Sequence, residues 1–156
     1  MSRARSEADI AATAGAAVSL AAVDAVLREA VRRVAAVDPN PTDPFRGLYI
    51  TDDAALQTAD AIDGSNAEGR LAQVAAALGL DPLDTTLLAA CVAPDLDPRY
   101  GRLVAYLHDD VACRRPSPRL LARLLSSDDL PEPVIIARLS AAAPLRAGGA
   151  LLLGSG

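Results

Sequence analysis

The chain has 156 residues, of which 34 are Ala, 23 are Leu, 15 are Arg and none is Lys, and its formal net charge is −5. Only 3% of the residues are aromatic, so the core must be aliphatic, and the abundance of Ala and Leu favours helices over sheets. The absence of Lys excludes a P-loop and Schiff-base catalysis within this chain, and the acidic excess disfavours nonspecific binding to DNA or anionic membranes.

Residues 6–37 have the pattern of one long amphipathic helix. Apolar residues recur at steps of three and four, and three arginines lie near the expected carboxyl end, where cations interact favourably with the helix dipole. Asp38 and Pro39 end the pattern. Acidic residues, including Asp24, interrupt the stretches that a signal peptide or a transmembrane helix requires, so we expect a cytoplasmic protein.

Residues 38–64 form a turn-rich connector rich in Pro, Asp and Gly. The apolar run at 48–50 is either a short strand or an extended tether packed on helices. We expect Phe45 to anchor this connector to the helical core, because a long unanchored loop is unusual in a compact domain. Arg46 and Tyr49 are the residue types that form interface hot spots, which is the alternative interpretation of the segment.

A regular helical pattern begins at residue 65. The first helix is predicted from Ser65 or Asn66 to about Leu78, followed by Gly79 in the left-handed position that ends many helices. Its predicted inward face comprises Leu71, Val74, Ala75 and Leu78.

Three further helices are predicted from an N-cap residue followed by proline. Asp81 begins a helix that Pro94 should end, Asp97 begins the next, and Ser117 begins a third that extends through Leu125. We expect these three helices to be joined by one buried cluster. Its members are Leu88, Leu103, Leu107 and Leu121.

The last part of the chain predicts one more helix and a small β-hairpin. Asp129 with Glu132 resembles a capping box, and two apolar runs flank a Gly pair within residues 143–153. Short helices on tight turns followed by a hairpin describe a helix-turn-helix core with a wing. The predicted fold is therefore mostly α, with a helical segment over 1–64 and a winged-helix-like half over 65–156.

Four motifs resemble the N-terminal winged-helix-type region of bacterial AAA+ ATPases that are common in actinobacteria. They are FRGLYI at 45–50, APDLDPRY at 93–100, AYLHDD at 105–110 and RRPS at 114–117. The resemblance covers about two-thirds of the chain. It implies a non-catalytic recruitment or regulatory domain that binds a protein partner or substrate.

The same resemblance implies what this chain does not contain. In that family ATP and Mg²⁺ bind to a separate ATPase module, which alone carries the Walker motifs, and no cofactor is expected in the N-terminal domain. The full protein would assemble as a hexameric ring, and some members are encoded beside contractile injection systems. We expect this chain to be such an N-terminal domain, with the final residues 154–156 serving as a linker.

The motifs supply the candidate interaction residues. Asp97 is the expected N-cap, and Asp95 is expected to pair locally with Arg99. The acidic pair at 109–110 is expected to bind Arg114 or Arg115, because no nucleophile or base lies nearby in the sequence to make it catalytic. The full set is Phe45, Arg46, Tyr49, Asp95, Asp97, Arg99, Tyr100, Tyr106, Asp109, Asp110, Arg114 and Arg115.

The alternative function is a nucleic-acid-binding winged helix. Arg115, Arg119 and Arg123 follow one another at i, i+4 and i+8, where a recognition helix would contact phosphates or guanines. The acidic net charge and the absence of aromatic, Asn or Gln readers in this helix oppose that interpretation.

An enzyme in its own right is disfavoured because the chain contains no catalytic constellation. A metal site formed by His108, Cys91 and Cys113 is also disfavoured, because the spacing lacks the paired ligands of zinc sites. The two cysteines are expected to be reduced, buried thiols.

Overall fold

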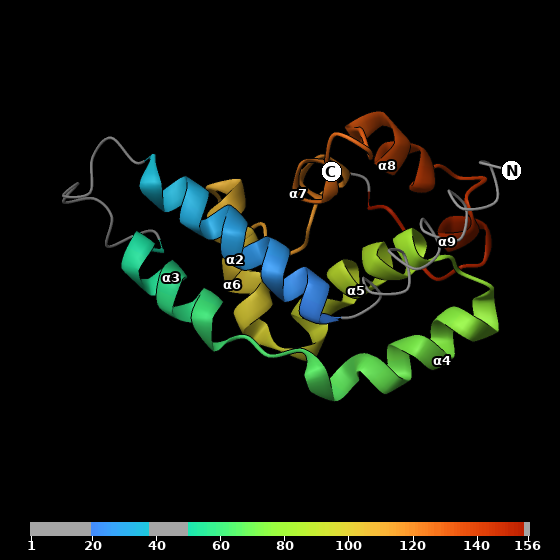
Figure 1. Ribbon diagram of the computed structural model, residues 1–156, viewed down its shortest axis with the longest axis horizontal. Helices are drawn as coiled ribbons and strands as arrows, with labels where there is room; N and C mark the ends of the chain where they lie inside the picture. Colours follow the sequence, from blue (N-terminus) through green and yellow to red (C-terminus); the bar gives the residue numbers. More distant parts are fainter. Residues whose placement is uncertain (1–19, 38–49, 155–156) are drawn as a thin grey trace, which may run out of the picture.

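The computed structural model describes residues 20–37 and 50–154, and these residues form a helical protein. In chain order the helices are α2 (Leu20–Ala36), α3 (Asp52–Ala61), α4 (Glu68–Leu78), α5 (Pro82–Leu96), α6 (Pro98–His108), α7 (Pro118–Leu125), α8 (Glu132–Arg138) and α9 (Pro144–Ala147) (Figure 1). A 3-10 turn at Ser65–Ala67 precedes α4. None of these helices combines the length and the apolar character that crossing a membrane requires.

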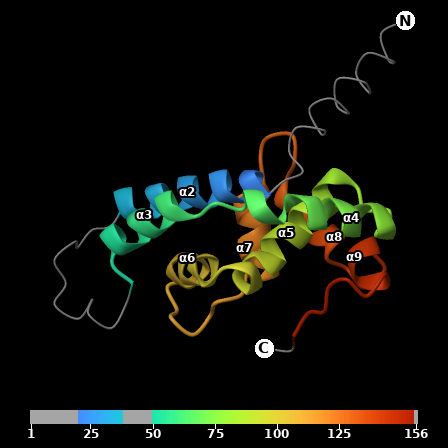
Figure 2. The same ribbon diagram turned by 90° about the horizontal axis from the view of Figure 1, so that it is seen from below.

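The helices form two groups that share α5 and α7. Helices α2 and α3 lie side by side in one layer above α6, whereas α4, α8 and α9 gather at the other end of the molecule (Figure 2). Helix α2 contacts α3, α5, α6 and α7, and α7 in turn contacts α8. The helix predicted over 6–37 is confirmed over residues 20–36, and its earlier part lies outside the described residues.

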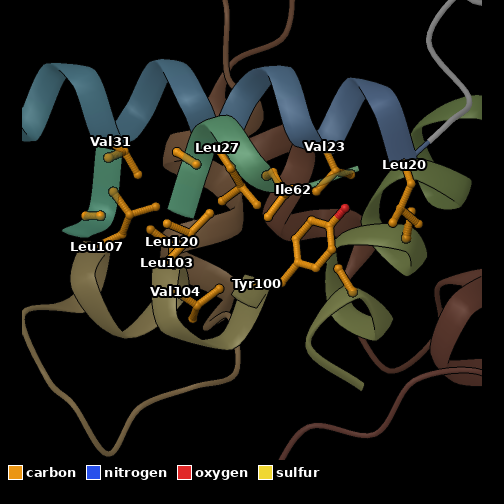
Figure 3. Close-up of a cluster of buried hydrophobic side chains, with 14 residues drawn as sticks. Leu20, Val23, Leu27, Val31, Ile62, Tyr100, Leu103, Val104, Leu107 and Leu120 are labelled. Atoms are coloured by element: carbon orange, nitrogen blue, oxygen red, sulfur yellow. The ribbon is translucent and has the colours of Figure 1, made fainter. Parts of the chain in front are cut away.

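The first core lies between α2, α3 and α6. One face of α2 supplies Leu20, Val23, Leu27 and Val31 at the helical spacing that the sequence predicts. Side chains from α6 meet this face, and Tyr100 directs its hydroxyl toward α2 (Figure 3). The α6 and α7 members are Tyr100, Leu103, Val104, Leu107 and Leu120.

A second core joins α5, α7, α8 and α9. Its buried members are Leu87, Leu88, Leu121, Ala122, Ile135, Leu139 and Leu145. The prediction of one cluster joining the central helices is therefore wrong in one respect. Leu103 and Leu107 belong to the first core, whereas Leu88 and Leu121 belong to the second, although all four are buried as predicted. Adjacent residues of α7 point to different cores, because successive side chains on a helix face different directions.

The N-cap signals of the three proline-started helices are confirmed. The side chains of Asp81, Asp97 and Ser117 accept hydrogen bonds from the backbone N–H groups two or three residues later, at 2.8, 2.8 and 3.2 Å. Each cap satisfies a donor that has no partner within the helix. Gly79 ends α4 with φ 62°, as its position predicts.

Helix α3 is absent from the sequence prediction, which treated residues 38–64 as a connector. Thr51 caps it by accepting from the Ala54 N–H at 3.2 Å, and Asp52 and Asp53 occupy its first turn. Its small residues Ala55 and Ala59 are buried against the first core, so α3 approaches α2 and α6 closely.

Two predicted helix features differ in the structure. Helix α5 continues through Pro94 to Leu96, because the proline lies in the last turn and the next bond, from the Asp97 N–H to the Ala93 carbonyl at 3.0 Å, still forms. The predicted inward face of α4 is too wide: Val74 and Leu78 are exposed, because α4 packs on α5 and the 3-10 turn along a narrow strip.

The predicted capping box and hairpin near the C-terminus are wrong. Pro131 is the N-cap of α8 and makes no side-chain cap, because Asp129 lies in the turn of an isolated β-bridge between Ser127 and Leu130. Over 143–153 the structure has the short helix α9, whose Leu145 is fully buried in the second core. The described residues contain no β-strand, so the mostly α fold is confirmed without the wing hairpin.

A buried polar group lies inside the first core. The carboxylate of Asp24 accepts a hydrogen bond from the Tyr100 hydroxyl at 2.5 Å and from the Gly64 N–H at 3.0 Å. A Cβ at Gly64 would lie 2.3 Å from the Cβ of Leu20, so only glycine permits this close approach. Asp24 therefore ties α2 to α6 and to the segment between α3 and α4.

An ion-pair group connects α5 to α8. Arg138 donates to the carboxylates of both Asp81 and Asp84, the latter at 3.2 Å. Asp84 is 1% exposed, and its Oδ1 has no hydrogen-bond partner among the described residues. Burial raises the pKa of Asp84 above its ordinary value, and the neighbouring Asp81 adds to this effect, while Arg138 opposes it.

Arg138→Ala is expected to lower the free energy of unfolding by about 2 kcal/mol near neutral pH, because it leaves the buried Asp84 carboxylate without its cation. The loss should shrink as the pH falls through the folded-state pKa of Asp84, which lies above the unfolded-state value, because protonation removes the buried charge that Arg138 compensates. Urea unfolding at about pH 7 and about pH 4 measures both values. Two results would contradict this account. One is that Arg138→Ala lowers the free energy of unfolding equally at the two pH values, and the other is that its effect is undiminished when Asp84 is replaced by Asn.

Candidate interaction groove

A groove of about 1200 Å³ lies between the second half of α2, the start of α3, the end of α6 and the end of α7. It exists because these four elements meet around the first core without closing over it. Its lining residues are Ala25, Val26, Glu29, Ala30, Arg33, Val34, Val37, Ile50, Asp52, Ala105, Tyr106, Leu107, Asp109, Asp110, Val111, Arg123, Leu124 and Ser126.

The floor of the groove is aliphatic. Leu107 is buried at its base, and Val26, Ala30, Ile50 and Leu124 are half-buried around it. The apolar surface continues outward to side chains that remain in solvent. Val34, Val37 and Val111 are 42%, 78% and 45% exposed. Exposed apolar side chains joined to a groove are unusual on a surface that has no binding role.

Charged groups surround this floor, and carboxylates outnumber guanidiniums four to two. Arg33 donates to Glu29 at 2.9 Å, and Arg123 donates to the Leu107 carbonyl at 3.2 Å. Both arginines of the rim are therefore already engaged with the protein itself. The Tyr106 hydroxyl donates to Asp52 at 2.8 Å.

The two other rim carboxylates belong to Asp109 and Asp110, which follow α6. Asp109 ends the helix with φ 55°, a left-handed conformation that Asp tolerates better than most residues. The Asp110 side chain accepts from the Ala112 N–H at 2.9 Å. Both residues are exposed, and no ion pair in the described part of the chain involves either of them.

The predicted pairing of the 109–110 acids with an arginine of the RRPS motif is wrong for Arg115. This guanidinium instead binds Asp95 through two hydrogen bonds of 2.7 and 3.0 Å. The segment after α6 folds back over that helix, and a Cβ on Gly101 would lie 3.4 Å from the Arg114 Cβ. Arg115 consequently reaches Asp95 at the end of α5 and does not reach the acids in the turn after α6.

The predicted pair between Asp95 and Arg99 is also wrong. Arg99 binds Asp97, two residues before it, with Nη2 to Oδ2 at 2.6 Å, and its Nη1 donates to the Ala61 carbonyl at 2.5 Å. The hydrogen bond from the Arg99 guanidinium to the Asp97 carboxylate holds the pKa of Asp97 below its ordinary value. Asp97 and Arg99 thus fasten the start of α6 to the end of α3, away from the groove.

The remaining candidates separate into three groups. Tyr100 belongs to the buried core, whereas Tyr106 lines the groove together with the 109–110 acids. Phe45, Arg46 and Tyr49 lie outside the described residues. The sequence prediction does not include the groove wall that α2 contributes. The valines that continue the apolar face of this helix beyond residue 31 are a sequence signal that could have indicated this wall.

The arginines proposed for DNA contact do not form one free cationic stripe. Arg115 precedes α7 and is paired with Asp95, and the Arg123 guanidinium bonds to the end of α6. Arg119 is exposed.

The cysteines and the histidine are not brought together as a metal site, because no three potential ligands cluster in the described residues. Cys91 and Cys113 are free and half-buried, and burial raises the pKa of Cys91 to about 11. His108 accepts a hydrogen bond through Nε2 from the Ser117 N–H at 3.4 Å. Its imidazole therefore bridges α6 to the start of α7.

Comparison with known families adds one finding. A family described as "Winged helix domain, variant" matches residues 5–155. No curated protein and no solved structure gives a significant match. The family match spans nearly the whole chain and agrees with the mostly α fold and with the short helices separated by tight turns. The chain therefore belongs to the winged helix domain variant family.

Proposed function

We propose that this chain is a non-catalytic protein-interaction domain that recruits a partner protein. The observation that carries the proposal is the groove, whose aliphatic floor leads to exposed Val34, Val37 and Val111 inside a polar rim. Apolar surface of this kind marks protein–protein contacts. The winged helix family is compatible with the proposal but does not assign it, because one fold serves many functions.

The finer form of the proposal comes from the resemblance of the motifs to bacterial AAA+ ATPases. In that form the domain couples a partner or substrate protein to a hexameric ATPase ring in the cytoplasm, with ATP and Mg²⁺ bound only in the separate ATPase module. A connection to contractile injection systems is part of the same proposal. Tyr106 and the acids at 109–110 support it, because these motif residues line the groove.

A nucleic-acid-binding winged helix remains the alternative. Exposed Arg119 on α7 favours it. The engagement of Arg115 and Arg123 with the protein's own acceptors opposes it, since a guanidinium that is already paired gains less from a phosphate.

Photo-crosslinking in the native host tests protein recruitment. A photoreactive side chain is placed in the full-length protein at one of three exposed positions on different elements, Val37, Val74 or Val134. We expect at least one position to form a reproducible adduct with the same partner protein, identified by mass spectrometry. The absence of an adduct at all three positions would contradict recruitment through this domain.

Duplex DNA should not bind this chain detectably at about 0.15 M salt. The reason is the acidic net charge together with the engagement of two of the three proposed contact arginines. Fluorescence anisotropy over a range of salt concentrations measures this. A steep loss of affinity with salt that disappears in Arg119→Ala, but persists in the control Arg102→Ala on exposed α6 surface, would instead establish the DNA-binding alternative.

A further inference from the structure

We infer that the groove binds a cationic amphipathic helix of the partner protein, with aliphatic side chains on the floor and Arg or Lys side chains at Asp109 and Asp110. The inference rests on the proposed recruitment function and adds the chemistry of the partner. Two independent features of the groove support it, the extent of its apolar surface and the sign of its unpaired charge.

The groove has the dimensions of a binding site for a polypeptide segment. The groove volume of about 1200 Å³ exceeds the range of about 300–1,000 Å³ typical of small-molecule sites. The exposed valines lie on two walls, with Val34 and Val37 on the α2 side and Val111 after α6. A helix laid between these walls would place side chains at i, i+3, i+4 and i+7 on both of them and on the floor.

The negative charge of the rim favours a positively charged ligand. Glu29 is already neutralised by Arg33, and Asp52 accepts from Tyr106, but the acids at 109–110 are exposed and have no ion pair in the described part of the chain. Carboxylates after the last turn of a helix are unfavourably placed relative to its dipole. A cationic side chain would relieve this repulsion, whereas an acidic ligand would increase it.

The test separates the partner helix from two other occupants of the groove. Residues 38–49 connect Val37 to Ile50, both of which line the groove, so the chain's own segment is one. A second copy of the chain is the other.

The probe is a designed fluorescent helical peptide with Leu at i, i+3, i+4 and i+7 and Arg on the flanking positions. A matched peptide carries Glu in place of each Arg. We expect the Arg peptide to bind the full chain and the Glu peptide to bind at least about tenfold more weakly, because only the first complements the rim. Anisotropy measures both affinities.

Two variants locate the site. Asp109→Asn combined with Asp110→Asn should weaken the Arg peptide at least about tenfold while retaining the fold, since Asn tolerates the left-handed conformation at residue 109. Val34→Asp should abolish binding by charging the apolar wall. Val74→Asp on α4 is the matched control, because this valine is 43% exposed, close to the 42% of Val34, and lies outside the groove. Circular dichroism confirms that each variant is folded.

Several results would overturn the inference. Equal binding of the two peptides, or binding unaffected by Val34→Asp, would show that the groove is not the site. Binding that appears only after Phe45→Ala would assign the groove to the chain's own segment. A dimer in sedimentation velocity that Val34→Asp dissociates would assign it to a second copy. Adducts in the host from Val74 or Val134 alone would show that the partner binds outside the groove, while the proposed recruitment function stands. The absence of all adducts would contradict the recruitment function itself.

Discussion

Asp24→Ala is expected to lower the free energy of unfolding by about 3–5 kcal/mol. The carboxylate is 3% exposed and accepts from the Tyr100 hydroxyl at 2.5 Å and from the Gly64 N–H at 3.0 Å. Without it both donors stay buried and have no acceptor, and a buried donor left unsatisfied costs about 1–3 kcal/mol. The substitution also leaves a small cavity between α2 and α6.

A double-mutant cycle with Tyr100→Phe separates these contributions. Tyr100→Phe alone removes one donor and keeps the ring, so its effect should be smaller than that of Asp24→Ala. The two substitutions together should be clearly non-additive, because they remove the two partners of one hydrogen bond. Urea unfolding followed by circular dichroism gives the four values. A loss below about 1 kcal/mol for Asp24→Ala would mean that the buried network is not formed.

This network shows where sequence reasoning stops. Asp24 falls within an apolar helical pattern and is evident in the sequence only as an interruption that argues against a membrane span. Its partner Tyr100 lies 76 residues away, and nothing local indicates that the two will meet. Arg28, one turn later on α2, likewise donates to the carbonyls of Ala59 and Ile62 at 2.9 and 2.5 Å. Such contacts depend on how helices pack.

Local signals were sufficient where the chemistry is local. The caps of α5, α6 and α7 were predictable because an Asp or Ser followed by proline both satisfies an N–H and presets the backbone of the first turn. The left-handed Gly79 was predictable because glycine has no Cβ and adopts a positive φ at a helix end without strain. Each of these features involves residues within a few positions of one another.

Helices α3 and α9 were missed because their stability comes from tertiary packing. Helix α3 has a weak apolar pattern and is surrounded by Pro-, Asp- and Gly-rich segments, and it is held by the burial of Ala55 and Ala59. Helix α9 has only four residues, and Leu145 anchors it in the second core. An isolated helix of either length is marginal in water.

The groove is predictable only in part, because it is assembled from four elements that are distant in the sequence. The resemblance of the AYLHDD motif indicated Tyr106 and the acids at 109–110, which line one side. The opposite wall comes from α2 and the residue after it, where Val34 and Val37 continue the same apolar stripe that forms the core. Which part of that stripe is buried and which part stays exposed depends on where α6 ends.

Leu103→Ala is expected to lower the free energy of unfolding by about 2–5 kcal/mol. Leu103 is 0% exposed and lies on α6 beneath the α2 side chains of the first core (Figure 3). Truncation removes buried methyl groups and leaves a cavity, and the surrounding helices can relax only partly. Thermal and urea unfolding measure the loss, and a melting temperature indistinguishable from that of the unmodified chain would contradict the assignment of this face as inward.

Pairing this substitution with others tests whether the two cores are energetically separate. Ile135→Ala lies in the second core, so its effect should add to that of Leu103→Ala within about 0.5 kcal/mol. Leu27→Ala shares the first core with Leu103, so that pair should deviate from additivity by more, since the two cavities share neighbouring side chains. Equal coupling in both pairs would mean that the cores act as one. Additivity of the first pair alone would show that α5 and α7 link two independently packed clusters, with the groove beside the first of them.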